Sequence, residues 1–204
     1  MDERGAGVAL GGAAAQPVTC AWAASTPEYV LYHDQEWGRP VTDDTGLYER
    51  LSLEAFQSGL SWLTILRKRE NFRRAFDGFD PAKVAAYTER DVARLMADAS
   101  IVRNRSKIEA AVANARAALD LPGGVARLIW GFADPDAPAP RTPADVPAVT
   151  EGSKGLAKAL KKAGFRFVGP TTAYALMQAC GLVNDHVSGC PARPFSGPGA
   201  ISPL

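Results

Sequence analysis

Apolar residues recur every three to four positions through most of the chain, which is the period of an amphipathic helix. Leu47, Leu51 and Phe56 mark one such face, in a helix that Asp43 or Asp44 caps and that ends near residue 58. Gly59 then interrupts the pattern. The same signals predict further helices over 61–76, after Asp80-Pro81, over 89–97, 101–119 and 127–132, over 153–163 with Ser153 as the cap, and over 171–180.

Strand patterns are nearly missing from the sequence. Apolar and polar residues alternate only over the four residues 165–168. Residues 133–149 hold five of the fifteen prolines and predict a loop. Residues 20–38 lack a clean period but carry large aromatic residues, so we expect an irregular segment that docks on the rest of the protein. The sequence therefore predicts an all-α fold of about eight helices.

The two ends of the chain differ from its middle. Residues 1–18 are rich in Gly and Ala, and they lack the basic start and the long apolar centre of a signal peptide. We expect a flexible extension over 1–18, one domain of two small helical lobes over 19–191, and a tail over 192–204.

The composition is that of an ordinary globular protein, with 47% hydrophobic and 22% charged residues. No apolar run approaches the roughly 18 to 20 residues that span a bilayer, so no membrane partner is expected. Three cysteines, an odd number, argue against a disulfide framework and suit a reducing compartment. We expect a cytoplasmic protein, and nothing indicates more than a monomer.

Two cysteines and two histidines form pairs near opposite ends of the chain. Cys20 and His33 have the spacing C-x12-H, and His186 and Cys190 have the spacing H-x3-C. Structural zinc takes four thiolate or imidazole ligands in a tetrahedron, so these residues are candidates for one zinc site that ties the two ends together. The spacing alone does not exclude buried cysteines and histidines that bind no metal.

A catalytic zinc is a competing interpretation, because Asp34 and Glu36 flank His33. Catalytic zinc usually keeps three protein ligands and one open position, whereas four ligands close the site. The set of four therefore favours a structural ion. Cys180 lies within a helical pattern with no histidine in register, and we assign it to the core.

Basic residues gather in three clusters although the net charge is only +1. A single cluster is most often a solvated helix face. Three in a nearly neutral chain indicate that acidic residues lie elsewhere, which suits a polyanion such as DNA or RNA. The clusters are Arg67, Lys68, Arg69, Arg73 and Arg74; Arg103, Arg105 and Lys107; and Lys154, Lys158, Lys161, Lys162 and Arg166.

Glu54 lies on a helix face that should point inward. On a helical wheel it falls between Leu47 and Leu51, where a carboxylate needs a partner or a function. A buried carboxylate beside Tyr32 and Trp62 would suit a flat, cationic aromatic ligand, because the rings stack and the acid balances the charge. The sequence alone does not bring these residues together.

Long motifs give the chain a family resemblance. It resembles the DNA-3-methyladenine glycosylase I family of the helix-hairpin-helix DNA glycosylase superfamily over about residues 20–191. The resemblance rests on YHDQEWGRP (32–40), LEAFQSGLSWLTILRKRENF (53–72), FDP (79–81), IVRNRSKI (101–108) and GFRFVGPTTAYALMQACGLVNDH (164–186).

The resemblance implies an enzyme that flips a damaged nucleotide out of double-stranded alkylated DNA and hydrolyses the N-glycosidic bond of 3-methyladenine. It implies a monofunctional reaction that leaves an abasic site, one structural zinc ion and no nucleotide cofactor. The implied roles are base recognition by Glu54; stacking by Tyr32 and Trp62, with Tyr29 and Trp22 as neighbours; a wedge at Gly59 and Leu60; a DNA-gripping hairpin from Ile101 to Lys107 that includes Arg103 and Arg105; and zinc ligation by Cys20, His33, His186 and Cys190.

One departure from the family pattern is expected to lower DNA affinity modestly without loss of activity, and two other functions stay open beside the resemblance. The family usually has glycine at the position of Ser100, and a β-carbon there would alter the hairpin or its approach to phosphate. A non-catalytic, zinc-containing DNA-binding module is the first alternative. A zinc hydrolase that uses His33, Asp34 and Glu36 is the second.

Overall fold

The computed structural model describes residues 20–198, and within this range the fold is all-helical, without a β-strand. The expected extension over 1–18 lies outside the described residues. None of the described helices combines the length and the apolar character needed to cross a membrane. The α-helices are α1 (Pro27–Gln35), α2 (Asp44–Gln57), α3 (Trp62–Ala75), α4 (Pro81–Ala85), α5 (Glu89–Ala97), α6 (Arg105–Leu119), α7 (Gly124–Trp130), α8 (Glu151–Lys162) and α9 (Pro170–Ala179).

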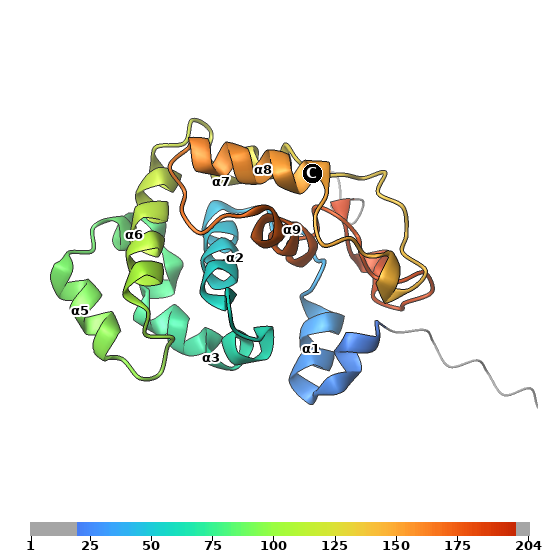
Figure 1. The fold of residues 1–204 in the computed structure, drawn as a ribbon, viewed down its shortest axis with the longest axis horizontal. Coiled ribbons are helices and arrows are strands. Elements are labelled where there is room, and N and C mark those ends of the chain that lie inside the picture. The colour runs from blue at the N-terminus through green and yellow to red at the C-terminus, as the bar shows by residue number, and fades with distance from the viewer. Residues whose placement is uncertain (1–19, 199–204) are drawn as a thin grey trace, which may run out of the picture.

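Helix α2 is the centre of the fold. It packs against α3, α6, α7 and α9, and Figure 1 shows it in the middle of the molecule, with α6 on one side and α9 on the other. Its residues enter two hydrophobic cores. Leu47 and Leu51 belong to the core formed with α7, α8 and α9, whereas Tyr48, Leu53 and Phe56 belong to the core formed with α3 to α6.

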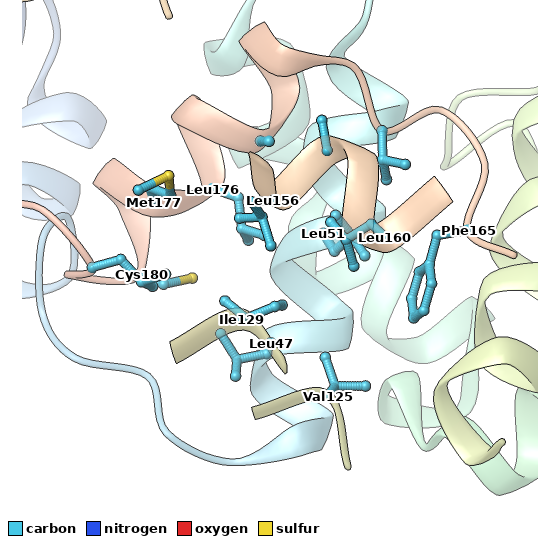
Figure 2. Close-up of a cluster of buried hydrophobic side chains, with 14 of the residues drawn as sticks. Leu47, Leu51, Val125, Ile129, Leu156, Leu160, Phe165, Leu176, Met177 and Cys180 are labelled. Atoms are coloured by element: carbon cyan, nitrogen blue, oxygen red, sulfur yellow. The ribbon is translucent and has the colours of Figure 1, made fainter. Parts of the chain in front are cut away.

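The first core holds the C-terminal helices on α2. Figure 2 shows Leu51 from α2 meeting Leu156 and Leu160 from α8 and Leu176 from α9. All four side chains are fully buried, and each such leucine contributes about 1.5–3 kcal/mol of transfer free energy. Cys180 lies fully buried in the same core, as its position in the sequence predicted.

Several helix limits match the sequence predictions within two residues. Asp43 caps α2 by accepting a hydrogen bond from the Gly46 amide, and Asp80 caps α4 directly before Pro81. Helix α5 has the predicted limits. The sequence signals worked here because capping is local and needs no tertiary partner.

Other local predictions were wrong. Residues 101–104 are not helical, because Asn104 caps α6 by accepting a hydrogen bond from the Lys107 amide. Thr150, not Ser153, is the N-cap of α8; Ser153 completes a capping box with it. By contrast, the absence of a strand at 165–168 agrees with the predicted all-α fold; there the Asn114 side chain donates to the carbonyl of Arg166 and accepts from its amide.

Both ends of the described chain are more ordered than the sequence suggested. Residues 20–38 are not irregular: they form a 3₁₀ turn over Ala21–Ser25 and then α1, which Thr26 caps and Pro27 begins. The chain also stays packed after Pro191. The Asn184 side chain donates to the carbonyls of Arg193 and Ser196, and the Gly197 amide donates to the Gly38 carbonyl, so residues 192–197 are not a free tail.

Candidate active site and metal-ligand cluster

The four predicted metal ligands meet in one buried cluster. One ligand atom from each of Cys20, His33, His186 and Cys190 lies within 4.8 Å of the others. His33 Nε2 is 3.0 Å from His186 Nδ1, and the Cys190 sulfur is 3.5 Å from each of these nitrogens. Tetrahedral zinc, with bonds near 2.0 Å to nitrogen and 2.3 Å to sulfur, spaces its ligands by about 3.3–3.8 Å. The separations lie close to this range, so the four residues could hold such an ion.

Neighbouring groups orient the two imidazoles. Asp34 Oδ1 lies 2.7 Å from His33 Nδ1, and the Trp37 carbonyl lies 3.0 Å from His186 Nε2. Each ring therefore gives its N–H to an oxygen and turns the other nitrogen toward the cluster, which is the usual arrangement around a metal. Burial lowers the pKa of His186 to about 4, so the ring is neutral, as a ligand must be.

Burial also raises the pKa of Cys20 to about 11, and the proximity of Cys190 adds to this shift. Without a cation the Cys20 thiol would remain protonated at neutral pH, and a bound metal would favour its thiolate.

A cavity of about 560 Å³ opens beside the metal-ligand cluster. Its volume is in the range of small-molecule sites. Rings from four segments line it: Trp22 from the first 3₁₀ turn, Tyr29 and Tyr32 from α1, Trp37 from the segment after α1, and Trp62 from the start of α3. The ring centroids of Tyr32 and Trp62 are 5.4 Å apart, and the ring of Trp22 lies edge-on to that of Tyr29 at 5.6 Å.

Glu54 is the acid of this aromatic cavity. It projects from α2 and is only 6% exposed, and its carboxyl group makes no hydrogen bond to any residue within 20–198. Burial raises its pKa to about 8, and Arg50, one helical turn earlier, opposes this shift. A buried carboxyl group without a protein partner is costly, so its position in a ligand-sized cavity indicates a binding function. The structure brings Glu54, Tyr32 and Trp62 together in one cavity, which the sequence alone could not show.

A second polar group in the cavity was not predicted from the sequence. Asp185 accepts hydrogen bonds from the Tyr174 hydroxyl (2.6 Å) and from the Gln178 amide (2.8 Å), and both Gln178 and Asp185 line the cavity. Tyr174 and Gln178 lie four positions apart on α9, so they share a face. That spacing was a detectable signal, but it does not reveal which carboxylate the face meets.

The segment between α2 and α3 presents Leu60 to solvent. Leu60 is 42% exposed, and Gly59 has a left-handed φ of +81°, which a side chain would strain. Lys107 supports this turn from inside: its ammonium group donates to the carbonyls of Phe56 and Ser58.

The predicted hairpin over 101–107 does not present its residues as expected. Ile101 is buried, and Lys107 is only 8% exposed, with its ammonium group used inside the protein. Arg105 is exposed but pairs with Glu89 and Glu109, so its charge is partly balanced. Arg103 is exposed as predicted. The backbone of Ser100 is not left-handed, so its β-carbon causes no conformational strain.

Most residues of the first basic cluster form ion pairs with acids of the protein itself. Arg67 pairs with Glu28, Arg69 with Glu36, and Arg73 with Glu49 and Glu70. In the third cluster, Lys158, Lys161, Lys162 and Arg166 are exposed, while Lys154 pairs with Glu151. Sequence clustering therefore overstated the free positive charge near α3.

Within residues 20–198 the protein combines an all-helical fold, an aromatic cavity with a buried acid, and a Cys₂His₂ cluster beside that cavity. A family model described as methyladenine glycosylase matches residues 22–193. The chain belongs to this family.

Relatives agree with this assignment. The chain is 49% identical to DNA-3-methyladenine glycosylase 1 of Escherichia coli strain K12 over 184 residues, which cover 88% of this chain and 98% of the relative. A crystal structure of 3-methyladenine DNA glycosylase I matches with a TM-score of 0.83 and 47% identity, over 87% of this chain and 100% of that chain. A structure of the Staphylococcus aureus enzyme, which concerns 3-methyladenine recognition, matches with a TM-score of 0.83 and 38% identity, over 86% and 96% of the two chains.

Proposed function

We propose that this protein removes 3-methyladenine from alkylated double-stranded DNA by hydrolysing the N-glycosidic bond, as a monofunctional base-excision repair enzyme. The observation that carries the proposal is the unpaired, buried Glu54 within an aromatic cavity. Membership of the methyladenine glycosylase family and the recognition of 3-methyladenine by a solved relative support the choice of base.

Recognition of the base would come from charge and stacking together. Methylation at ring position 3 makes the adenine of the nucleotide cationic, and a cation is attracted to an ionised Glu54 and to aromatic faces. The base would stack on Tyr32 and Trp62, while Tyr29 and Trp22 close the side of the pocket. Binding the cation would lower the pKa of Glu54 from its raised value, because an opposite charge favours the carboxylate.

Catalysis would need little acid assistance. The methylated base is a good leaving group, so positioning and a water nucleophile suffice while the bond breaks toward an oxocarbenium-like sugar. No lysine among the described residues lines the cavity as a Schiff-base nucleophile, in agreement with an abasic product and an uncut strand.

The DNA would be held at two places. Gly59 and Leu60 would fill the gap that the flipped nucleotide leaves. We assign the helix-hairpin-helix element to α8, residues 163–169 and α9, in place of the sequence prediction at 101–107. Helices α8 and α9 pack together, Arg166 and Phe167 between them are exposed, and the start of α9 offers backbone amides to phosphate. Arg103 would add an outer contact.

The metal-ligand cluster would hold one zinc ion with a structural role. Its four ligands join the N-terminal turn and α1 to residues 186–190, so the ion would fix Trp22, Tyr29 and Tyr32 against the pocket. Asp34 orients His33, and Glu36 is bound by two arginines, which counts against the zinc hydrolase that uses these two acids. The proposal takes the protein to act as a monomer in the cytoplasm, without a nucleotide cofactor.

Incubation with methylated duplex DNA, followed by chromatography of the free bases, tests the function. We expect release of 3-methyladenine, little 7-methylguanine, and strand breaks only after treatment that cleaves abasic sites. Binding to DNA without base release would favour the non-catalytic module instead.

A further inference from the structure

A compact charge network joins α1, α2 and α3, and one of its members, Arg50, lies on the same helix as Glu54. Glu36, just after α1, accepts two hydrogen bonds from Arg69 on α3, at 2.6 and 2.7 Å, and one from Arg50 on α2, at 3.0 Å. The two arginine side chains are each 13% exposed. One carboxylate thus serves two cations in a poorly solvated place, where each contact is stronger than at the surface.

Arg50 is the less satisfied of the two arginines. Its Nη1 is buried and has no hydrogen-bond partner among residues 20–198, although Nη2 reaches Glu36. Arg50 and Glu54 are four positions apart on α2, so their side chains share one face of the helix. Nevertheless they form no ion pair, and Glu54 has no partner in the described part of the chain.

We propose that Glu36 is a positioning residue: held by Arg69, it keeps Arg50 away from Glu54, so that the pocket carboxylate remains available to the cationic base. This proposal rests on the proposed function of the pocket. Without Glu36, a buried arginine with unused donors would turn to Glu54, the unpaired acid one helical turn away on the same face of α2. The carboxylate would then be neutralised by the protein itself.

Within residues 20–198, few other ionisable groups face Glu54. Tyr32 approaches from α1 and Cys180 from the end of α9, while Cys20, Tyr29 and Asp185 line the same cavity. Burial raises the pKa of both Tyr32 and Cys180, with Glu54 adding to each shift, so neither supplies a charge at neutral pH. Arg50 is therefore the described cation that acts on Glu54, and its position decides whether Glu54 is free.

If the network had only a structural role, the variants would behave differently. Glu36 links α1 to α2 and α3, so removing it would also loosen these helices whatever happens at Glu54. Removing Arg50 together with Glu36 distinguishes the positioning role from the structural role. Without Arg50, Glu54 is again unpaired, but the links between the helices are still lost.

The test compares Glu36→Gln, Arg50→Met and the double variant with the wild-type protein. The glutamine side chain carries no charge and offers one acceptor oxygen, which cannot satisfy both arginines. The ionisation of Glu54 is followed by ¹³C NMR of its carboxyl group, assigned through Glu54→Gln. The release of 3-methyladenine from methylated DNA is followed in the same proteins, and zinc content and thermal unfolding report on the fold.

In Glu36→Gln we expect the titration midpoint of Glu54 to fall by about one pH unit or more, and base release to fall about tenfold or more. In Arg50→Met and in the double variant the midpoint should return to the wild-type value or rise above it. At the alkaline end of the profile, release by the double variant should exceed that of Glu36→Gln.

An unchanged midpoint in Glu36→Gln, or a double variant as inactive as Glu36→Gln, would overturn the proposal. The failure of the proposed function looks different: the wild-type protein would release no base, while the NMR titration would still report whether Glu36 controls Arg50.

Discussion

Replacement of Glu54 by glutamine should make the protein more stable while it slows base release. The pKa of Glu54 is raised from an ordinary value of 4.5 to about 8 by burial. A group whose pKa is raised on folding favours the folded state fully below its unfolded value, and this contribution is lost as the pH rises toward the folded value. Ionisation of Glu54 therefore lowers the unfolding free energy progressively between pH 4.5 and 8, and this free-energy cost is constant above pH 8.

The magnitude follows from the two pKa values. At about 1.4 kcal/mol per pH unit, ionisable Glu54 costs about 1 kcal/mol at pH 5 and about 5 kcal/mol at pH 9, relative to a residue that does not titrate. Glu54→Gln should thus gain about 4 kcal/mol of unfolding free energy over the wild type between these pH values. The buried amide has its own cost, but that cost does not change with pH.

Urea unfolding at pH 5, 7 and 9, with zinc in excess, measures this difference directly. Glu151→Gln is the matched control: this glutamate side chain is 89% exposed, and its replacement should give no pH-dependent difference. If the advantage of Glu54→Gln did not grow with pH, the carboxyl group would not be buried and unpaired as described.

Two further predictions concern the supports of the site. Lys107→Met should lower the unfolding free energy by about 2–4 kcal/mol, because two charged hydrogen bonds to the end of α2 are lost. The control Arg105→Met should leave urea denaturation nearly unchanged. Equal effects of the two substitutions would contradict the internal role of Lys107. Asp34→Ala should weaken zinc binding by about 10- to 100-fold in competition with a chelator, because His33 loses the group that orients it; an unchanged affinity would show that the hydrogen bond is not used.

Local signals predicted much of the fold. The caps of α2 and α4 and the limits of α5 depend on a few neighbouring residues, so they can be predicted from the local sequence alone. The segment 20–38 was misjudged because its helix is short and its apolar residues serve the cavity and the metal-ligand cluster, so they show no amphipathic period. The packing of residues 192–197 depends on Asn184 and Gly38, of which Gly38 is distant in sequence.

The candidate site could be predicted where residue chemistry is unusual. A glutamate on an apolar face and a Cys₂His₂ set are rare enough to be noticed. Whether a charged side chain is free or paired was harder to predict. Whether Arg69, Arg105 or Lys107 faces solvent depends on acids and carbonyls that the fold supplies from elsewhere, namely Glu36, Glu89 and the end of α2.

The central claim is that Glu54 recognises the cationic base, and single-turnover release of 3-methyladenine from methylated duplex DNA tests it most directly. With the wild-type protein and Glu54→Gln compared at neutral pH, we predict that the variant folds, retains zinc and binds DNA, but releases the base about 10- to 100-fold more slowly, the loss of one charge-assisted hydrogen bond. Equal rates for the two proteins would contradict the account.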